Sequence, residues 1–431
     1  MIRVFLTGLL LIFVLSPTVS VCAGEADGWI PLFNGKNMDG WKEIPPHPGR
    51  GRLPNRWVAE DGIMINKNRG CDISGGPNLT DLQLHVEWKL PKRSNSGIYL
   101  RGRYEIQIQD DYGKKLGAGS CGGIYGQLTP RVNACYPAGE WQSFDAILRD
   151  NRVTVVHNGV HTIMNGPLKS VTGAAMPGKH GDPGPVKIQG DHGPISLRNI
   201  QIRPLKKDET PVAFPAKTGF ARIFDGKTLA GWSATKTGHG SGGKWEVVDG
   251  AIAGGQDPPG NGGVILSKES YGDFELTADV RPDWGCDSGV FLRSTKEGKC
   301  YQIMVDYYGG GNVGGIYGEG TGGFNVRNYD FAPDSKKLVV RKEPSEGALP
   351  LAPEKADALC FHDDWNHIRC RMTGNPPTID VWLNGVHILH FTDTEKRLGD
   401  TGQIGLQVHG GKGWPMGKKT RFRQIEIKRL N

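Results

Sequence analysis

The residues best suited to chemistry gather in one polar stretch, Asn95–Gly126. Four of its side chains alternate with apolar residues and offer an aromatic ring, a cation, a carboxylate and an amide: Tyr99, Arg101, Glu105 and Gln107. Successive side chains of a β-strand point to opposite faces, so these four are expected to share one face of two neighbouring strands. Such a face suits a sugar or another polyol. A solvated outer surface is the simpler alternative.

The same stretch returns as Asp287–Gly318, and both copies close on Gly-Gly-Ile-Tyr-Gly. Similar repeats flank it on both sides, including a Gly-Trp pair near each start and an Asn-Gly-Val later on. Each copy is the size of a domain. The sequence therefore predicts a first domain over 27–205, a linker rich in charge and proline over 206–219, and a second domain over 220–431.

The elements that must position these residues are predicted to be strands. Apolar and polar residues alternate with period 2 in most segments, as in Leu82–Leu90 and Phe274–Val280, and this pattern is typical of strands. Asn158-Gly159 and Asn384-Gly385 suit tight hairpin turns, because they accept positive φ. No segment has convincing helical periodicity, so the predicted fold class is all-β, with two tandem sandwich or jelly-roll domains. Two long insertions, Met164–Pro185 and Thr321–Phe361, are expected to shape binding rims.

The N-terminus predicts export. Residues 1–23 have the charge, apolar run and small-residue end of a signal peptide, and no later stretch is long and apolar enough to span a bilayer. The mature protein is expected to be secreted or periplasmic. Cys22 raises lipoprotein anchoring as the less favoured alternative, since Val21 fits poorly before it. The formal net charge is +7 without a basic run, which argues against nucleic-acid binding.

Export permits disulfides. Seven cysteines follow the predicted cleavage site, and the two pairs that suit local bridges are Cys121–Cys135 and Cys360–Cys370. No cysteine pair has the close Cys-x-x-Cys spacing of a zinc site, so the spacing predicts none.

An ordered set of motifs carries a family resemblance. The set runs from Gly-Trp and Asp-Gly through NSGIYLR, YEIQIQD, GGIYG and GEW to IQGDHGPISLRNIQI. It resembles the 3-keto-disaccharide hydrolase domain family, formerly a domain of unknown function, over roughly Trp29–Leu205 and Phe220–Leu430. The resemblance implies a concanavalin-like jelly roll, as in lectins and glucanases. The second half departs from the pattern at Gln302 and Met304, opposite Glu105 and Gln107.

The resemblance also implies a reaction. In a glycoside already oxidised at C3, the ketone acidifies the C2–H. A base removes that proton, the C1 leaving group departs by β-elimination, and water then adds to the enone. An oxidoreductase would have to supply the 3-keto sugar. The Glu105 strand shows no second carboxylate beside it, which favours this route over the carboxylate pair of ordinary glycosidases.

Three residues are candidates for catalysis. Glu105 could be the base or a ligand to a metal that polarises the ketone, and its alternative is an ion pair with Arg101. Arg101 could stabilise the enolate oxygen, although its recurrence as Arg293 equally fits a structural anchor. His192 suits proton transfer to the leaving oxygen, and a structural hydrogen bond is its alternative.

Further residues are candidates for substrate binding: Tyr99, Gln107, Tyr125, Gln189, Arg293, Gln407 and His409. Asp110 ends a strand and could bind a divalent metal ion, which is the one cofactor considered. A turn cap is the more common role for a carboxylate there.

Three functions remain in competition. The leading hypothesis is an exported enzyme acting on 3-keto-glycosides or 3-keto-disaccharides. The second is a non-catalytic, lectin-like carbohydrate-binding protein, and the third is a structural or adhesion module of the cell surface. The second copy lacks Glu105, so we expect the first copy to catalyse and the second to bind glycan or brace the first.

Overall fold

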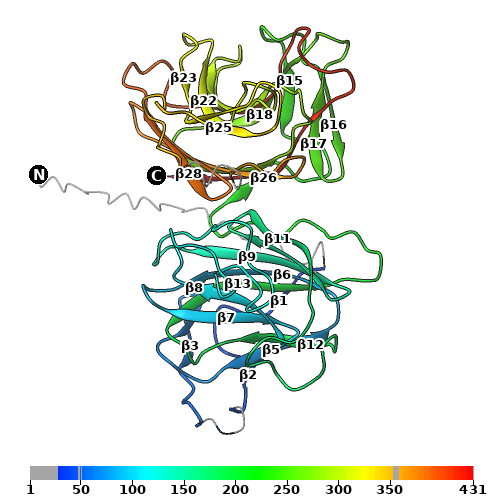
Figure 1. Cartoon of the computed structure of the whole chain (residues 1–431), viewed down its shortest axis with the longest axis vertical. Helices are drawn as coiled ribbons and strands as arrows, with labels where there is room; N and C mark the ends of the chain where they lie inside the picture. Colours follow the sequence, from blue (N-terminus) through cyan, green and yellow to red (C-terminus); the bar gives the residue numbers. More distant parts are fainter. Residues whose placement is uncertain (1–27, 47–48, 50, 353–358, 431) are drawn as a thin grey trace, which may run out of the picture.

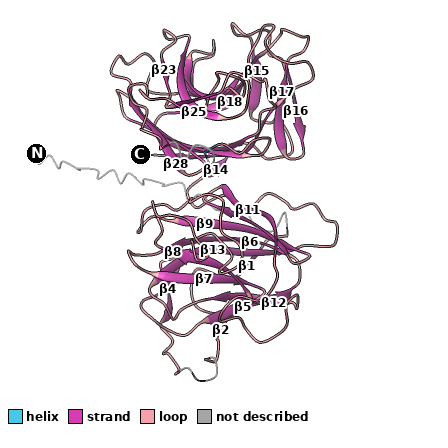
Figure 2. Cartoon of the chain, in the orientation of Figure 1, coloured by secondary structure: helices cyan, strands magenta, loops and turns pink. Residues whose placement is uncertain are grey.

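The chain forms two stacked halves, each a pair of antiparallel sheets (Figure 1). The computed structural model describes residues 28–46, 49, 51–352 and 359–430, and the named elements in these ranges are all strands (Figure 2). The all-β prediction is confirmed. The predicted signal peptide lies outside the described residues. Within those ranges, no helix has the length and apolar character that a membrane span requires.

The first half packs an eight-stranded sheet on a five-stranded one. The larger sheet has the order β11 (Val160–Pro167), β10 (Arg152–His157), β9 (Gln142–Arg149), β6 (Leu82–Lys89), β13 (Ile195–Pro204), β4 (Ile63–Asn66) and β3 (Trp57–Glu60), with β1 (Ile30–Pro31) beside β13. The smaller sheet has the order β2 (Trp41–Glu43), β5 (Ile73–Leu79), β12 (Gly184–Ile188), β7 (Asn95–Leu100) and β8 (Tyr104–Gln109).

The second half repeats this arrangement, but its smaller sheet has seven strands where that of the first half has five. Its eight-stranded sheet has the order β16 (Lys244–Val248), β17 (Ala251–Gly255), β30 (Thr420–Arg429), β19 (Phe274–Val280), β26 (Asn366–Thr373), β27 (Thr378–Leu383) and β28 (Val386–Thr392), with β14 (Ala221–Arg222) beside β30. Its seven-stranded sheet has the order β15 (Trp232–Thr235), β18 (Gly263–Tyr271), β29 (Gly402–Val408), β20 (Ser288–Ser294), β21 (Cys300–Val305), β22 (Val313–Glu319) and β23 (Asn325–Val326). The insertion after β23 adds the pair β24 (Tyr329–Phe331) and β25 (Leu338–Val340).

Alternation along the strands builds the core of the first half. Leu84 and Trp88 of β6 and Ile98 and Ile106 of β7 and β8 point between the two sheets and are fully or almost fully buried. Burial of such side chains is the main driving force for stacking two sheets. The other face of β6 is buried too, because the linker covers it: Thr218 donates hydrogen bonds to the Glu87 carboxylate.

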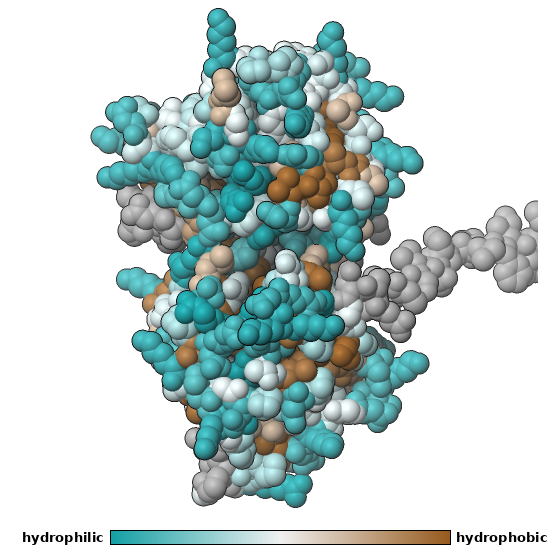
Figure 3. Space-filling model, turned by 90° about the vertical axis from the view of Figure 1, so that its right-hand side faces the viewer, coloured by the Kyte–Doolittle hydropathy of each residue, from teal (hydrophilic) through white to brown (hydrophobic). Residues whose placement is uncertain are grey.

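The outer faces of the two eight-stranded sheets meet between the halves. At this interface Arg131 Nη1 lies 3.0 Å from Asp364 Oδ2, and the Arg131 guanidinium stacks 3.5 Å from the centre of the Phe361 ring. The hairpin glycine Gly159 abuts the His367 ring. The two smaller sheets therefore remain free to carry pockets away from the interface. The face in Figure 3 is mostly hydrophilic, with small apolar patches on both halves.

The predicted local disulfides do not form in the structure. The seven cysteines from Cys71 to Cys370 are all buried and unbridged. Cys370 lies on β26 inside the second core, and Cys360 belongs to the loop before that strand. Cys121 and Cys135 do approach one another, together with His157.

Candidate functional site

A pocket of about 650 Å³ opens on the five-stranded sheet of the first half. Strands β7 and β8 form its floor, the loop after β8 forms one wall, and the loops on either side of β12 form the other. Most of the residues selected from the sequence line it: Tyr99, Glu105, Gln107, Tyr125, Gln189 and His192. The polar face predicted from alternation is real, but these loops bury much of it.

Glu105 lies at the floor of this pocket and is 4% exposed. Its strand pairs with β7 so that Glu105 lies opposite Tyr99, and its carboxyl packs against Gly97. Burial raises the pKa of Glu105 to about 7, against lowering by a hydrogen bond with Tyr99 and by the charge of Lys187. A carboxyl with this pKa is a suitable general base at neutral pH.

Two further charged residues lie near Glu105: Lys187 of β12 and Asp72, which directly precedes β5. The Lys187 ammonium is 1% exposed, lies 2.7 Å from Asp72 Oδ2 and sits 4.3 Å from the centre of the Tyr99 ring. Tyr99 pairs with both Glu105 and Lys187 across β7. Its hydroxyl oxygen lies 3.1 Å from the carbonyl oxygen of Gly173, which competes with the Glu105 carboxyl for the one hydroxyl proton. Four ionisable side chains are thus concentrated behind one pocket.

His192 faces the same pocket and is the more exposed of the two candidate proton carriers. Its Nδ1 is hydrogen-bonded to the Asp191 carboxylate, and this bond, with the nearby Glu105, raises the pKa of His192 above its ordinary value. A carboxylate-bound imidazole is a good proton donor near neutral pH. Asp191 is a second carboxylate in the pocket, which the Glu105 strand alone did not reveal, and it is bound to His192.

Two polar groups and one ring are placed to hold a polyol. The Gln189 side chain is 6% exposed, and its Oε1 has no hydrogen-bond partner among the described residues. Gln107 lies beside it, with its Oε1 accepting from the Ile108 N–H at 3.1 Å. Tyr125 is 45% exposed at the rim, and an exposed ring of this kind can stack on a sugar face.

Arg101 lies outside this pocket. Its guanidinium is 1% exposed and donates to the carbonyl oxygen of Thr80, to Asn151 Oδ1 at 2.7 Å and to Asp81 Oδ1 at 3.2 Å. Arg293 makes the equivalent contacts in the second half, to Gly272, Asp273 and Gly374. This geometry favours the anchoring role over enolate stabilisation. The alternative ion pair between Glu105 and Arg101 is also absent, since the charged partner of Arg101 is Asp81.

Asp110 has the geometry of a turn cap. Its Oδ2 accepts a hydrogen bond from the Arg93 backbone N–H at 2.9 Å. In the part of the chain that the structure describes, Asp110 belongs to no group of three or more metal-binding side chains. This hydrogen bond agrees with the alternative role considered from the sequence, and metal binding by Asp110 stays a prediction.

The strand register of the second half shows which residues occupy the positions that Glu105, Tyr99, Lys187 and Asp72 have in the first half. Gln302 lies opposite Phe291, and Phe291 lies opposite Gly405, whereas Glu105 lies opposite Tyr99 and Tyr99 opposite Lys187. Gly405 in turn pairs with Leu266, as Lys187 pairs with Ser74. Counting two residues back places Val264 at the position of Asp72. The second half therefore replaces all four ionisable groups with an amide and apolar residues.

Gln407 and His409 lie in a different setting from Gln189 and His192. Gln407 Oε1 accepts from Gln302 Nε2 at 3.1 Å, and the His409 ring lies 4.6 Å from the His239 ring. Gln189 bonds to Gly97 and Gln407 pairs with Gly289, so these glutamines correspond. His409 then comes two residues later and His192 three. The two histidines are not true counterparts, which corrects the sequence comparison.

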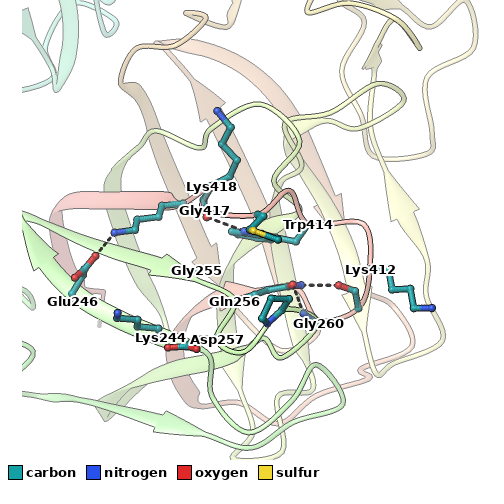
Figure 4. Close-up of a pocket in the computed structure, with 14 residues that line it drawn as sticks. Lys244, Glu246, Gly255, Gln256, Asp257, Gly260, Lys412, Trp414, Gly417 and Lys418 are labelled. Carbon is teal, nitrogen blue, oxygen red and sulfur yellow. Dashed lines mark hydrogen bonds and ion pairs between the residues drawn. The ribbon is translucent and has the colours of Figure 1, made fainter.

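The second half has a pocket of its own, of about 570 Å³, between the loop after β17 and the loop before β30 (Figure 4). Four lysines, two carboxylates and the Trp414 ring are among the side chains that line it. Gln256 connects the two loops by donating to the carbonyl oxygens of His409 at 2.8 Å and Gly411 at 2.9 Å. This pocket lacks an equivalent of Glu105 among the described residues.

Sequence reasoning missed Lys187, Asp72 and Asp191. A lysine between Val186 and Ile188 was a usable signal, because alternation directs it to the face opposite the core. Asp72 gave no signal, because it directly precedes β5 and meets Lys187 only through the pairing of β5 with β12, which are far apart in the sequence.

Comparisons with known proteins find the same kind of domain in each half of the chain. The family model for the 3-keto-alpha-glucoside-1,2-lyase-like domain matches residues 28–203 and again residues 219–428. A 3-keto-disaccharide hydrolase from Bacteroides thetaiotaomicron is 34% identical over 101 residues, which is 21% of this chain and 33% of that protein. The match thus spans one third of the relative's length.

Two solved structures are among those to which this chain is similar. One is a Parabacteroides distasonis protein whose name proposes a glycosyl hydrolase, with 24% identity, a TM-score of 0.35, and coverage of 42% of this chain and 95% of that one. The other is the carbohydrate-binding module CBM66 from Bacillus subtilis, with 16% identity, a TM-score of 0.32, and coverage of 46% and 95%.

Proposed function

Since this chain belongs to the 3-keto-alpha-glucoside-1,2-lyase-like domain family in both of its halves, we propose that it cleaves glycosides already oxidised to a ketone at C3. The first half performs the reaction in the pocket that contains Glu105. The observation that supports this most is Glu105 itself, a buried carboxyl whose pKa is raised to about 7 beside a cavity of sugar size.

The steps follow from the chemistry of the ketone. Glu105 takes the proton from C2, and the electron pair moves into an enolate and then expels the oxygen at C1. His192 gives a proton to that oxygen. Water then adds to the enone, with its hydroxyl at C1 and its proton at C2, so that the net result is hydrolysis. Loss of a correctly placed base or acid of this kind typically costs about 10²–10⁴-fold in rate.

The remaining pocket residues bind and orient the substrate. The unpartnered Gln189 Oε1 accepts from a sugar hydroxyl, and Tyr125 stacks on a ring face at the rim. Lys187 keeps part of the Glu105 population ionised, because its charge opposes the effect of burial. A separate oxidoreductase supplies the 3-keto sugar, and the protein works outside the cytoplasm.

The second half serves a binding or bracing role. At the position of the base it has Gln302, whose Nε2 donates to the Ser288 carbonyl oxygen at 3.2 Å. An amide cannot take a proton from carbon at neutral pH. The lysine-lined pocket of Figure 4 is where glycan binding would occur in this half.

The test measures the cleavage of a 3-keto-glucoside and of the unoxidised glucoside by the wild type and two variants. Wild type should release the leaving group from a 3-keto-glucoside and leave the unoxidised glucoside intact. Glu105→Gln should lose about 10²–10⁴-fold in rate while staying folded, because glutamine already occupies this position in the second half. Gln302→Ala is the matched control and should retain the wild-type rate.

Equal cleavage of both glucosides would instead indicate an ordinary glycosidase. An undiminished rate in Glu105→Gln would remove the proposed base. No cleavage of either substrate by wild type would leave the carbohydrate-binding function as the better explanation.

A further inference from the structure

Three side chains from separate loops and strands meet in the core of the first half: Cys121, Cys135 and His157. One ligand atom of each lies within 4.8 Å of the other two, and all three residues are buried. In the part of the chain that the structure describes, this is the one group of three or more His, Cys, Asp or Glu side chains close enough to share an ion.

The His157 ring points an unused nitrogen into this cluster. Its Nε2 lies 3.0 Å from Gln142 Oε1, which also accepts from the Tyr136 N–H. That oxygen is an acceptor, so Nε2 carries the proton and Nδ1 presents a lone pair. The ring is 0% exposed, and Nδ1 has no hydrogen-bond partner among the described residues.

The second half shows that the fold does not need polar groups at this place. The Asn158 side chain donates to the carbonyl oxygen of Ala134, and Asn384 donates to that of Leu359, so Cys135 corresponds to Cys360. The shared Gly-Gly-Ile-Tyr-Gly motif places Val313 at the position of Cys121, and the shared Asn-Gly turn places Leu383 at that of His157.

The close contacts agree with this correspondence. A Cβ at Gly122 would lie 2.9 Å from His157 Nδ1, and one at Gly314 would lie 3.6 Å from Leu383 Cβ. The first half thus holds two thiols and an imidazole where the second half is filled mainly by apolar side chains.

We propose that Cys121 Sγ, Cys135 Sγ and His157 Nδ1 bind a Zn²⁺ ion. Thiolate sulfur and imidazole nitrogen are the ligands that zinc prefers. On binding, each thiol releases its proton to solvent, and the two thiolates balance the charge of the ion. The three protein ligands leave the fourth position of a tetrahedral zinc for a water molecule. Because the two thiolates neutralise the ion, the centre costs less to bury than an isolated charge does.

The ion would stabilise one wall of the substrate pocket. Cys121 belongs to the loop after β8, from which Gly119, Ser120 and Tyr125 line that pocket. His157 ends β10 in the opposite sheet. Zinc therefore ties a glycine-rich loop to the sandwich core. This role in the pocket rests on the proposed function, whereas the metal site itself does not.

The experiment measures metal and thiols on the full chain. Protein purified under reducing conditions with Zn²⁺ present, then dialysed, should contain about one zinc per chain by mass spectrometry of the metal. Cys121→Ser and the double variant Cys121→Val/His157→Leu should lose it. The double variant copies the residues of the second half, so it should pack and fold. Cys360→Ser, which changes the corresponding isolated thiol, should keep the zinc.

Three results would overturn the proposal. One is a Cys121–Cys135 disulfide in the purified, unreduced protein, detected by peptide mass mapping. The second is zinc content unchanged in the folded double variant. The third is wild-type protein that takes up no zinc from excess Zn²⁺. None of these measurements depends on glycoside cleavage, so a failure here is distinct from a failure of the proposed activity.

Discussion

At the scale of single residues, the surroundings of Glu105 decide what its carboxyl can do. A solvated glutamate is ionised at neutral pH and is a weak base. Burial disfavours the charged form of Glu105, while a hydrogen bond with Tyr99 and the charge of Lys187 partly restore it. The balance leaves the pKa of Glu105 near 7, where the ionised fraction and the basicity are both useful.

Replacing Lys187 should therefore move the pH dependence of the reaction. Lys187→Met removes the cation that lowers the pKa of Glu105, so the ionised base should appear only at higher pH. We expect the rising limb of kcat/KM, near pH 7 in wild type, to shift upward. The measurement is a pH–rate profile of both proteins. An unchanged limb would mean that another group controls it.

Glu105 should also make folding depend on pH. Its pKa is raised from 4.5 to about 7 by folding, so between these values the native state holds a proton that the unfolded state has released. Stability should fall as pH rises through this window, by at most about 1.4 kcal/mol per pH unit. In Glu105→Gln this part of the slope should vanish. Denaturant unfolding at pH 5, 6 and 7 checks it, and equal slopes would contradict the burial argument.

The two histidines should differ in importance. His192 faces the pocket of Glu105 and is bound to Asp191, whereas His409 packs on His239 in the other half. We expect His192→Ala to lose about 10²–10⁴-fold in rate and His409→Ala to lose little. Steady-state kinetics on one keto-substrate compares them. Equal losses would show that the halves do not divide the work in this way.

At the scale of elements, the strand pair β7–β8 can hold the base in place because residue 97 is a glycine, which leaves room for the Glu105 carboxyl. Glu105 lies over Gly97, and Gln302 lies over Gly289 in the same way. Both copies keep glycine here because the side chain on the neighbouring strand occupies the space of a Cβ.

Gly97→Ala should displace the base without unfolding the sheet. The added methyl would collide with the Glu105 carboxyl, so we expect a loss in kcat that is much larger than the change in KM. Gly289→Ala makes the same collision with Gln302 and should leave the rate near wild type, which makes it the matched control. Circular dichroism and steady-state kinetics of both variants test this. A large loss in Gly289→Ala as well would point to a general effect on the fold.

At the scale of the whole molecule, duplication has allowed the halves to diverge. The first half keeps buried ionisable groups that are costly to bury, while the second keeps apolar residues at most of those positions. The halves stay joined through the outer faces of their larger sheets, where Arg131 meets Asp364 and the Gly159 turn meets His367.

A larger residue at Gly159 should loosen this interface. Gly159 has φ of 88°, and a Cβ there would collide with the His367 ring of the other half. Gly159→Leu should lower the unfolding temperature by several degrees more than Gly62→Leu. Gly62 is the matched control, a hairpin glycine with φ of 78° and open space around it. Differential scanning calorimetry makes the comparison, and equal shifts would mean that only backbone strain matters.

The sequence by itself determined the local features. Alternation specified strands and which face of each is apolar, because side-chain direction follows strand geometry residue by residue. The duplication specified two similar halves, and alternation placed Tyr99, Glu105 and Gln107 on one face. These are properties of neighbouring residues, so a single chain reveals them.

Only the tertiary structure decided which distant groups meet. Strand pairing brought Lys187 and Asp72 to Glu105, assigned Arg101 to Asp81, and showed that His409 is not the counterpart of His192. The chain between β8 and β9 brought Cys121 and Cys135 to His157 of β10, where cysteine spacing predicted no metal site. Such meetings depend on the order of strands in the sheets and on how loops cross them. Residue spacing along the chain does not specify either, because contacts between sheets join segments of arbitrary sequence separation.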